Sequence, residues 1–241
     1  MKEKSENISS SISFEDFKNQ ILADYKTIVL SRECSYLGRK EVLSGKAKFG
    51  IFGDGKELPQ VAMSHFFEKG DFRSGYYRDQ TLLFAQENLT PAQLFAALYA
   101  DLDLTREPMS GGRQMGAHFV TPFVDENGNW LPLKEMKNHS SDISPTASQM
   151  PRLVGLAQAS KLFREIPFKG LKEHSDHGNE IAWGTIGNAS TSEGVFFEAI
   201  NAAGVLQIPM VVSVWDDDYG ISVHNKDHTT KESISEALKG F

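Results

Sequence analysis

The chain has 241 residues, a formal net charge of −7 and 40% hydrophobic residues, enough for a packed core. An acidic chain without a basic stripe argues against nucleic acid as a partner. No apolar run is long enough to span a membrane, which argues against a membrane partner. A single cysteine, Cys34, excludes an internal disulfide, suits a reducing compartment and favours a cytoplasmic protein. The length allows one large α/β domain or two small ones.

The first part of the chain is predicted to be helical after a short leader. Residues 1–13 are rich in Ser, Glu and Lys and are expected to be flexible. Apolar residues then recur at helical spacing, which predicts an amphipathic helix from residue 14 to about Cys34, with the cysteine packed on its apolar face. A second helix is predicted from about Glu57 to Phe67.

Two further helices carry start signals. Thr90 is the predicted N-cap of a helix over residues 91–101, with Gln93 completing a capping box. Ser144 is the predicted N-cap of a helix whose first residue is Pro145.

Two segments between these helices carry polar residues suited to a binding site. Tyr77 and Arg78 place a phenol beside a planar, permanently charged guanidinium, which suits diphosphate oxygens. A surface arginine with its aromatic neighbour packed inward is the alternative. The glycine-dense segment 110–119 contains His118, which is either a hydrogen-bonding residue near a site or a structural histidine.

The segment from Ile181 to Trp215 predicts a βαβ unit. Residues 181–186 and 210–215 are apolar runs typical of buried parallel strands. Between them, residues 190–193 have the pattern of a capping box that opens a helix over residues 193–206. This helix is apolar almost all round and is expected to be buried. Together with the earlier helices, the unit predicts an α/β protein with a doubly wound, mainly parallel sheet.

Candidate ligands follow each of these strands. After the first comes a turn of small residues, Gly187, Asn188, Ala189 and Ser190. Such a turn before a helix offers free N–H groups and a positive dipole end, which favour phosphate. After the second strand comes Asp217, which is expected to face Asn188 across the top of the sheet. Two oxygen side chains and a backbone carbonyl suit Mg²⁺. Taken singly, the turn of small residues is typical of an ordinary capped turn, and the acidic residues are typical of a solvated loop. Together, in this order and after these strands, they favour a binding site.

This segment resembles the thiamine-diphosphate motif in the form found in 2-oxo acid dehydrogenases. The direct matches are Gly187, Ser192, Gly194, Tyr219, Gly220, Ile221 and Ser222. Asn188 stands where that family has an acid, and Asp217 stands where it has a metal-binding asparagine. The exchange keeps one carboxylate and one amide, which predicts a swapped but working Mg²⁺ site. Ala189 replaces a glycine of the motif.

The resemblance extends over about residues 16–241 and implies a thiamine-diphosphate-binding, transketolase-like fold in residues 14–241. It implies thiamine diphosphate and Mg²⁺ as cofactors, with K⁺ in a cation loop at Ser148 and Gln149. The Mg²⁺ ligands would be Asn188, Asp217 and the Tyr219 carbonyl. The remaining cofactor contacts would be Tyr77, Arg78, Gly187, Ala189 and Ser190 at the diphosphate, and Ser144 and Thr146 at the aminopyrimidine ring.

The implied activity is oxidative decarboxylation of a 2-oxo acid with acyl transfer to a lipoyl-bearing acyltransferase. Segments 110–119 and 144–149 favour the branched-chain type over the pyruvate type. A beta-type half, fused or separate, would supply the glutamate that activates the cofactor, in an α₂β₂-like assembly. The alternatives are another thiamine-diphosphate enzyme of the transketolase or decarboxylase kind, and a scaffold subunit that has lost the cofactor.

The end of the chain carries one more helix signal. A capping box at residues 229–232 predicts a helix to about Lys239. A doubly wound sheet is expected to continue with another strand after such a helix. We therefore expect this chain to be the diphosphate-binding part of a longer protein, truncated at its C-terminus.

Overall fold

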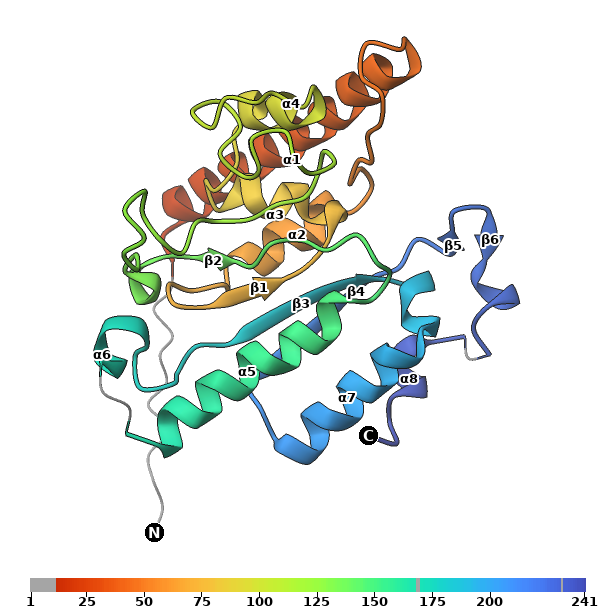
Figure 1. Ribbon diagram of the computed structural model, residues 1–241. Helices are drawn as coiled ribbons and strands as arrows, with labels where there is room; N and C mark the ends of the chain where they lie inside the picture. Colours follow the sequence, from red (N-terminus) through yellow and green to blue (C-terminus); the bar gives the residue numbers. More distant parts are fainter. Residues whose placement is uncertain (1–11, 168–169, 231) are drawn as a thin grey trace.

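Four parallel strands form the centre of the protein in the computed structural model, which describes residues 12–167, 170–230 and 232–241 (Figure 1). Their order is β2-β1-β3-β4. The strands are β1 (Phe72–Ser74), β2 (Asn138–His139), β3 (Ala182–Gly187) and β4 (Met210–Trp215). Beyond β4, a two-stranded antiparallel ribbon pairs β5 (Tyr219–Gly220) with β6 (Val223–His224). The predicted α/β class and parallel sheet are confirmed.

Helices lie on both sides of this sheet, with α5 and α7 on one side and α1 to α4 on the other (Figure 1). The α-helices are α1 (Phe14–Leu43), α2 (Glu57–Ser64), α3 (Gln80–Ala85), α4 (Pro91–Leu98), α5 (Gln149–Glu165), α6 (Leu171–His174), α7 (Gly194–Leu206) and α8 (Ile234–Ala237). Short 3₁₀ turns are η1 (Tyr77–Asp79), η2 (Leu133–Glu135), η3 (Ala189–Ser192) and η4 (Asn225–Asp227).

Successive side chains of β3 point to opposite faces of the sheet and pack into two separate apolar clusters. Ala182 and Ile186 join the buried residues of α5 and α7. Trp183 points to the other side and packs with Phe67, at 5.9 Å between ring centroids. Gly184 faces α5 so closely that a Cβ there would lie 2.2 Å from Leu153 Cδ2. The sheet and α5 are therefore in direct backbone-to-side-chain contact.

The close approach at Gly184 gives a first prediction. Gly184→Ala should destabilise the fold by about 1–3 kcal/mol, because the added methyl group overpacks the fully buried Leu153 side chain. The measurement is the free energy of unfolding in urea. Gly155→Ala in α5 is the control, since a Cβ at Gly155 meets open space and alanine favours the helix. Equal effects of the two substitutions would contradict the prediction.

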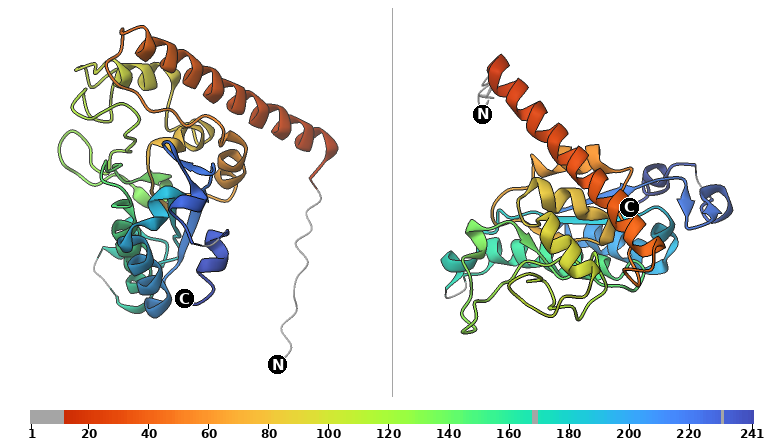
Figure 2. Two further views of the ribbon diagram at one scale, coloured as in Figure 1. Left: turned by 90° about the vertical axis from the view of Figure 1, so that its right-hand side faces the viewer. Right: turned by 90° about the horizontal axis from the view of Figure 1, so that it is seen from above.

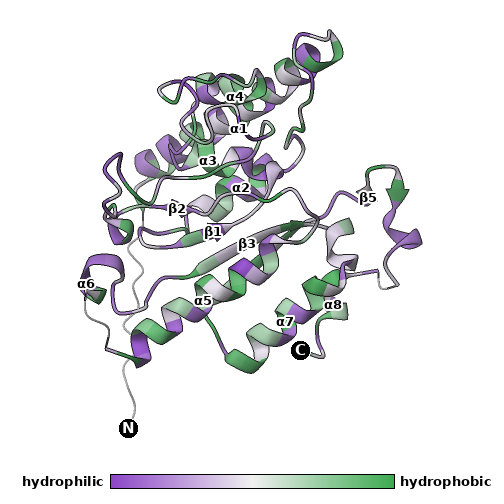
Figure 3. Cartoon of the chain, viewed as in Figure 1, coloured by the Kyte–Doolittle hydropathy of each residue, from purple (hydrophilic) through white to green (hydrophobic). Residues whose placement is uncertain are grey.

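The predicted βαβ unit is present, and its register runs from Ala182 opposite Met210 to Gly187 opposite Trp215. The prediction that its helix and second strand are buried is wrong. In α7 only Phe196 and Ala199 are buried, and in β4 only Trp215 is. The reason is position: β4 is the last strand in the sheet order, and α7 covers only one side of it. Figure 3 shows apolar residues on both elements.

The capping box predicted at residues 190–193 is also wrong. Residues 189–192 form the 3₁₀ turn η3, and α7 begins only at Gly194 with Glu193 as its N-cap. By contrast, the capping box between Thr90 and Gln93 is confirmed in both directions. Its helix is three residues shorter than predicted, ending at Leu98 rather than 101.

Other helix boundaries also differ from prediction, and α2 ends at Ser64 rather than at about Phe67. α1 continues nine residues beyond Cys34, and polar contacts such as Gln80 Nε2 to Ser35 Oγ (3.3 Å) attach this extension to α3. α5 starts at Gln149 rather than at Pro145, because Ala147 has a left-handed backbone with φ of +60°. Of the predicted box at 229–232, Lys231 lies outside the described residues; α8 begins at Ile234 with Ser233 as its cap.

The N-terminal half of α1 projects beyond the rest of the protein (Figure 2). Its apolar side chains are exposed there: Phe14 is 76% exposed and Tyr25 is 63% exposed. Of the predicted leader, residues 1–11 lie outside the described part. Within residues 12–167, 170–230 and 232–241, none of the helices has the length and apolarity required to cross a bilayer.

Candidate functional site

A pocket of about 600 Å³ opens where β3 ends. It brings together the predicted site residues from four separate segments, with the exception of Asp217. Those that line it are Tyr77, Arg78, Ser144, Thr146, Gly187, Asn188, Ala189, Ser190 and Tyr219. The position agrees with the general rule that parallel sheets bind ligands beyond the carboxyl ends of their strands.

Arg78 is held in the pocket by four contacts. Its Nε donates to the Tyr76 hydroxyl at 3.1 Å, and its Nη2 donates to the Tyr77 hydroxyl at 3.0 Å. The guanidinium carbon lies 5.3 Å from the centre of the Tyr77 ring, within cation–π range. Nη2 also lies 3.3 Å from the Asp217 carboxylate. Burial raises the pKa of Tyr76, so its hydroxyl stays protonated. The guanidinium is thus positioned before any ligand binds.

The segment that carries Arg78 is fixed by its neighbour Asp79, a role that the sequence did not reveal. Asp79 is fully buried and accepts hydrogen bonds from Arg73 Nε at 2.6 Å and Trp215 Nε1 at 2.9 Å. It also accepts from the Thr185 hydroxyl. These partners come from β1, β4 and β3, so one carboxylate ties three strands to the Arg78 segment. No local sequence signal distinguishes Asp79, because its partners are far away in the chain.

Asn188 is 2% exposed, and both N–H groups of its amide are used. Nδ2 donates to the Tyr219 carbonyl at 3.1 Å and to Asn225 Oδ1 at 2.6 Å. This leaves Oδ1 as the polar atom of the side chain that is open to a ligand. The sequence predicted Asn188 opposite Asp217; instead its network leads through Asn225 to Asp216, while Asp217 pairs with Arg78 at the edge of the pocket.

Ala189 is in close contact with the ribbon that follows β4. A Cβ at Gly220 would lie 2.4 Å from the Ala189 Cβ. The methyl group of Ala189 therefore fits only because residue 220 is glycine. The two residues together allow the η3 turn and the β5–β6 ribbon to pack side by side next to the pocket.

Ser144 does not cap a helix as predicted but contacts His118. Its Oγ lies 2.8 Å from His118 Nε2, and His118 also lines the pocket. Thr146 lines the pocket and is exposed. Gln149, predicted for a cation loop, lines the pocket while its Nε2 donates to the Thr185 carbonyl at 3.0 Å. Ser148 does not belong to the lining.

Asp142 is a pocket residue that the sequence analysis missed. Burial raises its pKa to about 6, and the guanidinium of Arg73, 2.5 Å from its Oδ1, acts in the opposite direction. Its Oδ2 accepts the Phe119 amide at 2.9 Å. Asp142 thus fixes the glycine-rich loop before it to the buried Arg73, and it shares that arginine with Asp79.

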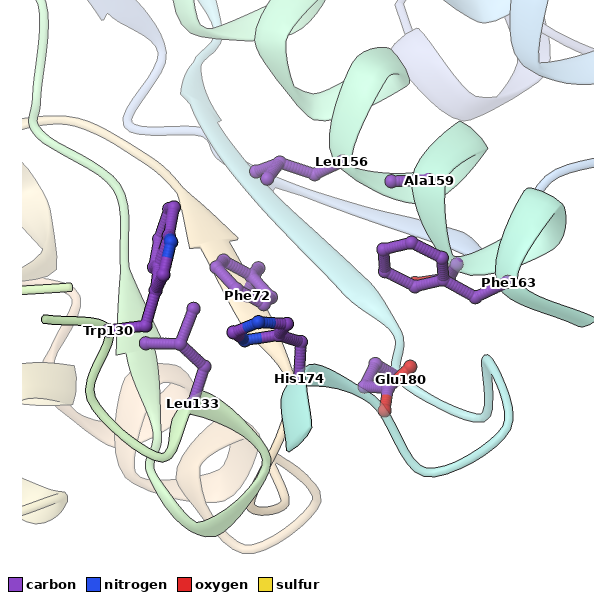
Figure 4. A pocket seen from close by; sticks show the side chains of 9 residues that line it. Phe72, Trp130, Leu133, Leu156, Ala159, Phe163, His174 and Glu180 are labelled. Atoms are coloured by element: carbon purple, nitrogen blue, oxygen red, sulfur yellow. The ribbon is translucent and has the colours of Figure 1, made fainter. Parts of the chain in front are cut away.

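A second cavity, of about 340 Å³, lies at the opposite end of β3 (Figure 4). Its walls are mainly aromatic and aliphatic, with His174 packed edge-on against Trp130 at 5.6 Å between ring centroids. None of the predicted site residues line it. Throughout the described ranges, no three His, Cys, Asp or Glu side chains are grouped as a metal site would require.

The donors in and beside the first pocket nonetheless suit a small, hard cation with a diphosphate. Asn188 and Tyr219 line the pocket, and the Asp217 carboxylate lies beside it, 3.3 Å from Arg78 Nη2. All three residues offer oxygen donors, the type that Mg²⁺ prefers. Mg²⁺ usually keeps only one or two protein carboxylates and completes its shell with water and phosphate oxygens. Arg78 supplies a rigid, charged donor for those phosphates. The residues present therefore fit Mg²⁺ and a diphosphate.

A parallel α/β sheet with a pocket at its carboxyl edge defines a class of protein that binds its ligands at that edge. The family described as "Dehydrogenase E1 component" matches residues 25–241, and the chain belongs to this family.

Over 219 residues, the chain is 27% identical to the 2-oxoisovalerate dehydrogenase subunit alpha of Bacillus subtilis (strain 168), covering 90% of this chain and 57% of that protein. It is 24% identical over 225 residues to the pyruvate dehydrogenase E1 component subunit alpha of Acholeplasma laidlawii, covering 93% and 53%. It is 23% identical over 225 residues to the mitochondrial 2-oxoisovalerate dehydrogenase subunit alpha of Homo sapiens, covering 93% and 43%. The chain spans about half the length of these curated relatives.

Proposed function

We propose that this chain is the alpha-type, diphosphate-binding part of a thiamine-diphosphate-dependent 2-oxo acid dehydrogenase. The observation that carries the proposal is the pocket at the end of β3, where Arg78 and the turn at Asn188 line the same cavity. An anion-binding arginine and oxygen donors for a cation are the two requirements of a metal–diphosphate site. Membership of the E1 family supports the same conclusion.

In this proposal each pocket residue has a defined task. Arg78, oriented by Tyr76 and Tyr77, binds the diphosphate. Asn188, Asp217 and the Tyr219 carbonyl hold Mg²⁺, and the backbone of the turn at 187–190 contacts the phosphates. Ser144 and Thr146, which line the other wall, contact the aminopyrimidine ring. When bound, thiamine diphosphate supplies the electron sink for decarboxylation, while the protein contributes binding, orientation and charge.

The substrate would be a 2-oxo acid of the branched-chain type, with pyruvate as the other candidate. The relatives named 2-oxoisovalerate dehydrogenase and pyruvate dehydrogenase support these two classes. The proposed partners are a beta-type half, in an α₂β₂-like assembly, and a lipoyl-bearing acyltransferase that accepts the acyl group. The beta-type half would complete the pocket and supply the glutamate that activates the cofactor.

Mg²⁺-dependent binding of thiamine diphosphate to the full-length, assembled enzyme tests the proposal, for example by isothermal titration calorimetry. Asp217→Ala should weaken binding in the presence of Mg²⁺ by more than the roughly 10–100-fold typical of outer-shell partners, because it removes the only carboxylate of the proposed ligand set. Asp218→Asn is the matched control: it removes a charge from the adjacent, exposed residue, and asparagine tolerates the φ of +65° at this position.

The result also separates the alternatives. An unaltered enzyme that binds no thiamine diphosphate would support a scaffold subunit. Binding without acyl transfer to a lipoyl carrier would support a transketolase-like enzyme. Binding that Asp217→Ala leaves unchanged would refute the assignment of the Mg²⁺ ligands.

A further inference from the structure

An amide ligand poses a problem that a carboxylate does not. A carboxylate presents oxygen whichever way it is turned, whereas an asparagine presents oxygen on one side and N–H donors on the other. Because this chain has Asn188 rather than an acid, its amide binds a cation only when Oδ1 faces the pocket. Something in the protein must therefore fix the orientation of this side chain.

The hydrogen bonds around Asn188 fix that orientation through groups with only one possible role. The Tyr219 carbonyl accepts only, so the amide atom 3.1 Å from it is the Nδ2 donor. A second route leads through Asn225, whose Oδ1 lies 2.6 Å from Asn188 Nδ2. Asn225 is itself oriented by Asp216: Asn225 Nδ2 donates at 2.9 Å to the Asp216 carboxylate, which also accepts only. Both routes engage Nδ2 and so leave Oδ1 as the atom of the amide that remains for a cation.

The backbone places Asn225 where it can hydrogen-bond to both Asp216 and Asn188. The β5–β6 ribbon pairs Tyr219 with His224, which brings the chain back beside the end of β4. Asn225 N then donates to the Asp218 carbonyl at 2.8 Å. The main chain of Asn225 is thus fixed by the ribbon and its side chain by Asp216, so little freedom remains for it to rotate.

We propose that Asn225 is a positioning residue for the cation site: it holds the Asn188 amide with Oδ1 directed toward the pocket, and so allows an asparagine to serve where the family motif has an acid. The inference rests on the proposed function. Asn225 does not touch the cation; it acts through Asn188. The need for it arises only because residue 188 is an amide.

A double-substitution cycle tests this role in the full-length, assembled enzyme. Mn²⁺, a paramagnetic substitute for Mg²⁺, is titrated in the presence of thiamine diphosphate, and free Mn²⁺ is measured by electron paramagnetic resonance. Asn225→Ala should weaken Mn²⁺ binding by about tenfold or more, as loss of an outer-shell partner does. The same substitution in an N188D background should cause no loss, because a carboxylate needs no orientation and is repelled by the Asn225 oxygen.

A merely structural role of Asn225 predicts equal losses in both backgrounds, and that result would overturn the proposal. Asn201→Ala, at an exposed asparagine of α7, is the control for substitution as such. If N188D itself binds no Mn²⁺, Asp216→Ala replaces it in the cycle. Asp216→Ala releases the Asn225 side chain, so it should weaken Mn²⁺ binding less in a protein that already carries Asn225→Ala than in the unaltered protein. Losses of Mn²⁺ affinity that simply add would also overturn the proposal. Absence of Mn²⁺ binding by the unaltered enzyme would instead refute the proposed function.

Discussion

Replacing Asp79 with alanine is expected to destabilise the fold by roughly 3–5 kcal/mol, the range for removing one partner of a buried ion pair. Asp79 and Arg73 are both fully buried, and among the described residues Arg73 would keep Asp142 alone as a charged partner. The Trp215 indole N–H and the Thr185 hydroxyl would lose their acceptor as well. This loss is a large fraction of the 5–15 kcal/mol typical of a whole domain.

The measurement is urea denaturation monitored by far-UV circular dichroism. Asp54→Ala is the control, because Asp54 pairs with Arg39 at the surface, where such pairs contribute about 0–1 kcal/mol. Trp215→Phe offers a milder test if Asp79→Ala does not fold: it removes one donor to the same carboxylate and should cost about 1 kcal/mol. An Asp79→Ala protein as stable as the Asp54→Ala protein would contradict the role given to this residue.

The sequence predicted those features that depend on neighbours in the chain. Thr90 and Gln93 formed their capping box because a cap needs only residues three positions apart. The strands around 181–186 and 210–215 were found because their apolar runs are continuous. All the predicted site residues except Asp217 line one pocket, because small turns and polar residues after parallel strands meet at one edge of the sheet.

Features set by distant contacts were not predictable in this way. α1 extends to Leu43 although the apolar pattern weakens after Cys34, and distant residues contact this extension: Gln80 donates to Ser35, and Tyr99 donates to Glu41. Ser144 resembles an N-cap in sequence, but its hydroxyl contacts His118 in the folded chain. Continuous apolarity also does not say how many sides of an element are covered, which is why the exposure of β4 was missed.

The site shows the same division between local and distant signals. Asn188 and Asp217 could be marked as candidates from the motif, but their partners could not. The carboxylate of Asp217 contacts Arg78, more than a hundred residues away, and Asn225 enters the network only because the β5–β6 ribbon folds back. A motif therefore marks candidate residues, and the tertiary structure determines how each of them is oriented.

Replacing Arg78 with alanine is expected to weaken binding of thiamine diphosphate by about 10–150-fold, the equivalent of one or more hydrogen bonds to a charged group at 1.5–3 kcal/mol. Two tyrosine hydroxyls and the Tyr77 ring already hold the guanidinium in place, so its donors lose little freedom on binding. Arg78→Lys keeps the charge but loses this fork geometry, and its binding should fall between that of Arg78→Ala and the unaltered protein.

The measurement compares thiamine diphosphate with unphosphorylated thiamine in the assembled enzyme. If Arg78 acts on the diphosphate, the substitution weakens binding of the first ligand and leaves binding of the second unchanged. Equal losses for both ligands would mean that Arg78 supports the pocket as a whole. Arg39→Ala is the control, since Arg39 is an exposed arginine paired with Asp54 and does not line the pocket. Arg78 also pairs with Asp217, so the Arg78→Ala substitution should leave the Asp217 carboxylate free to bind Mg²⁺. The direct effect of the substitution should therefore be on the affinity for the diphosphate and not on the affinity for Mg²⁺.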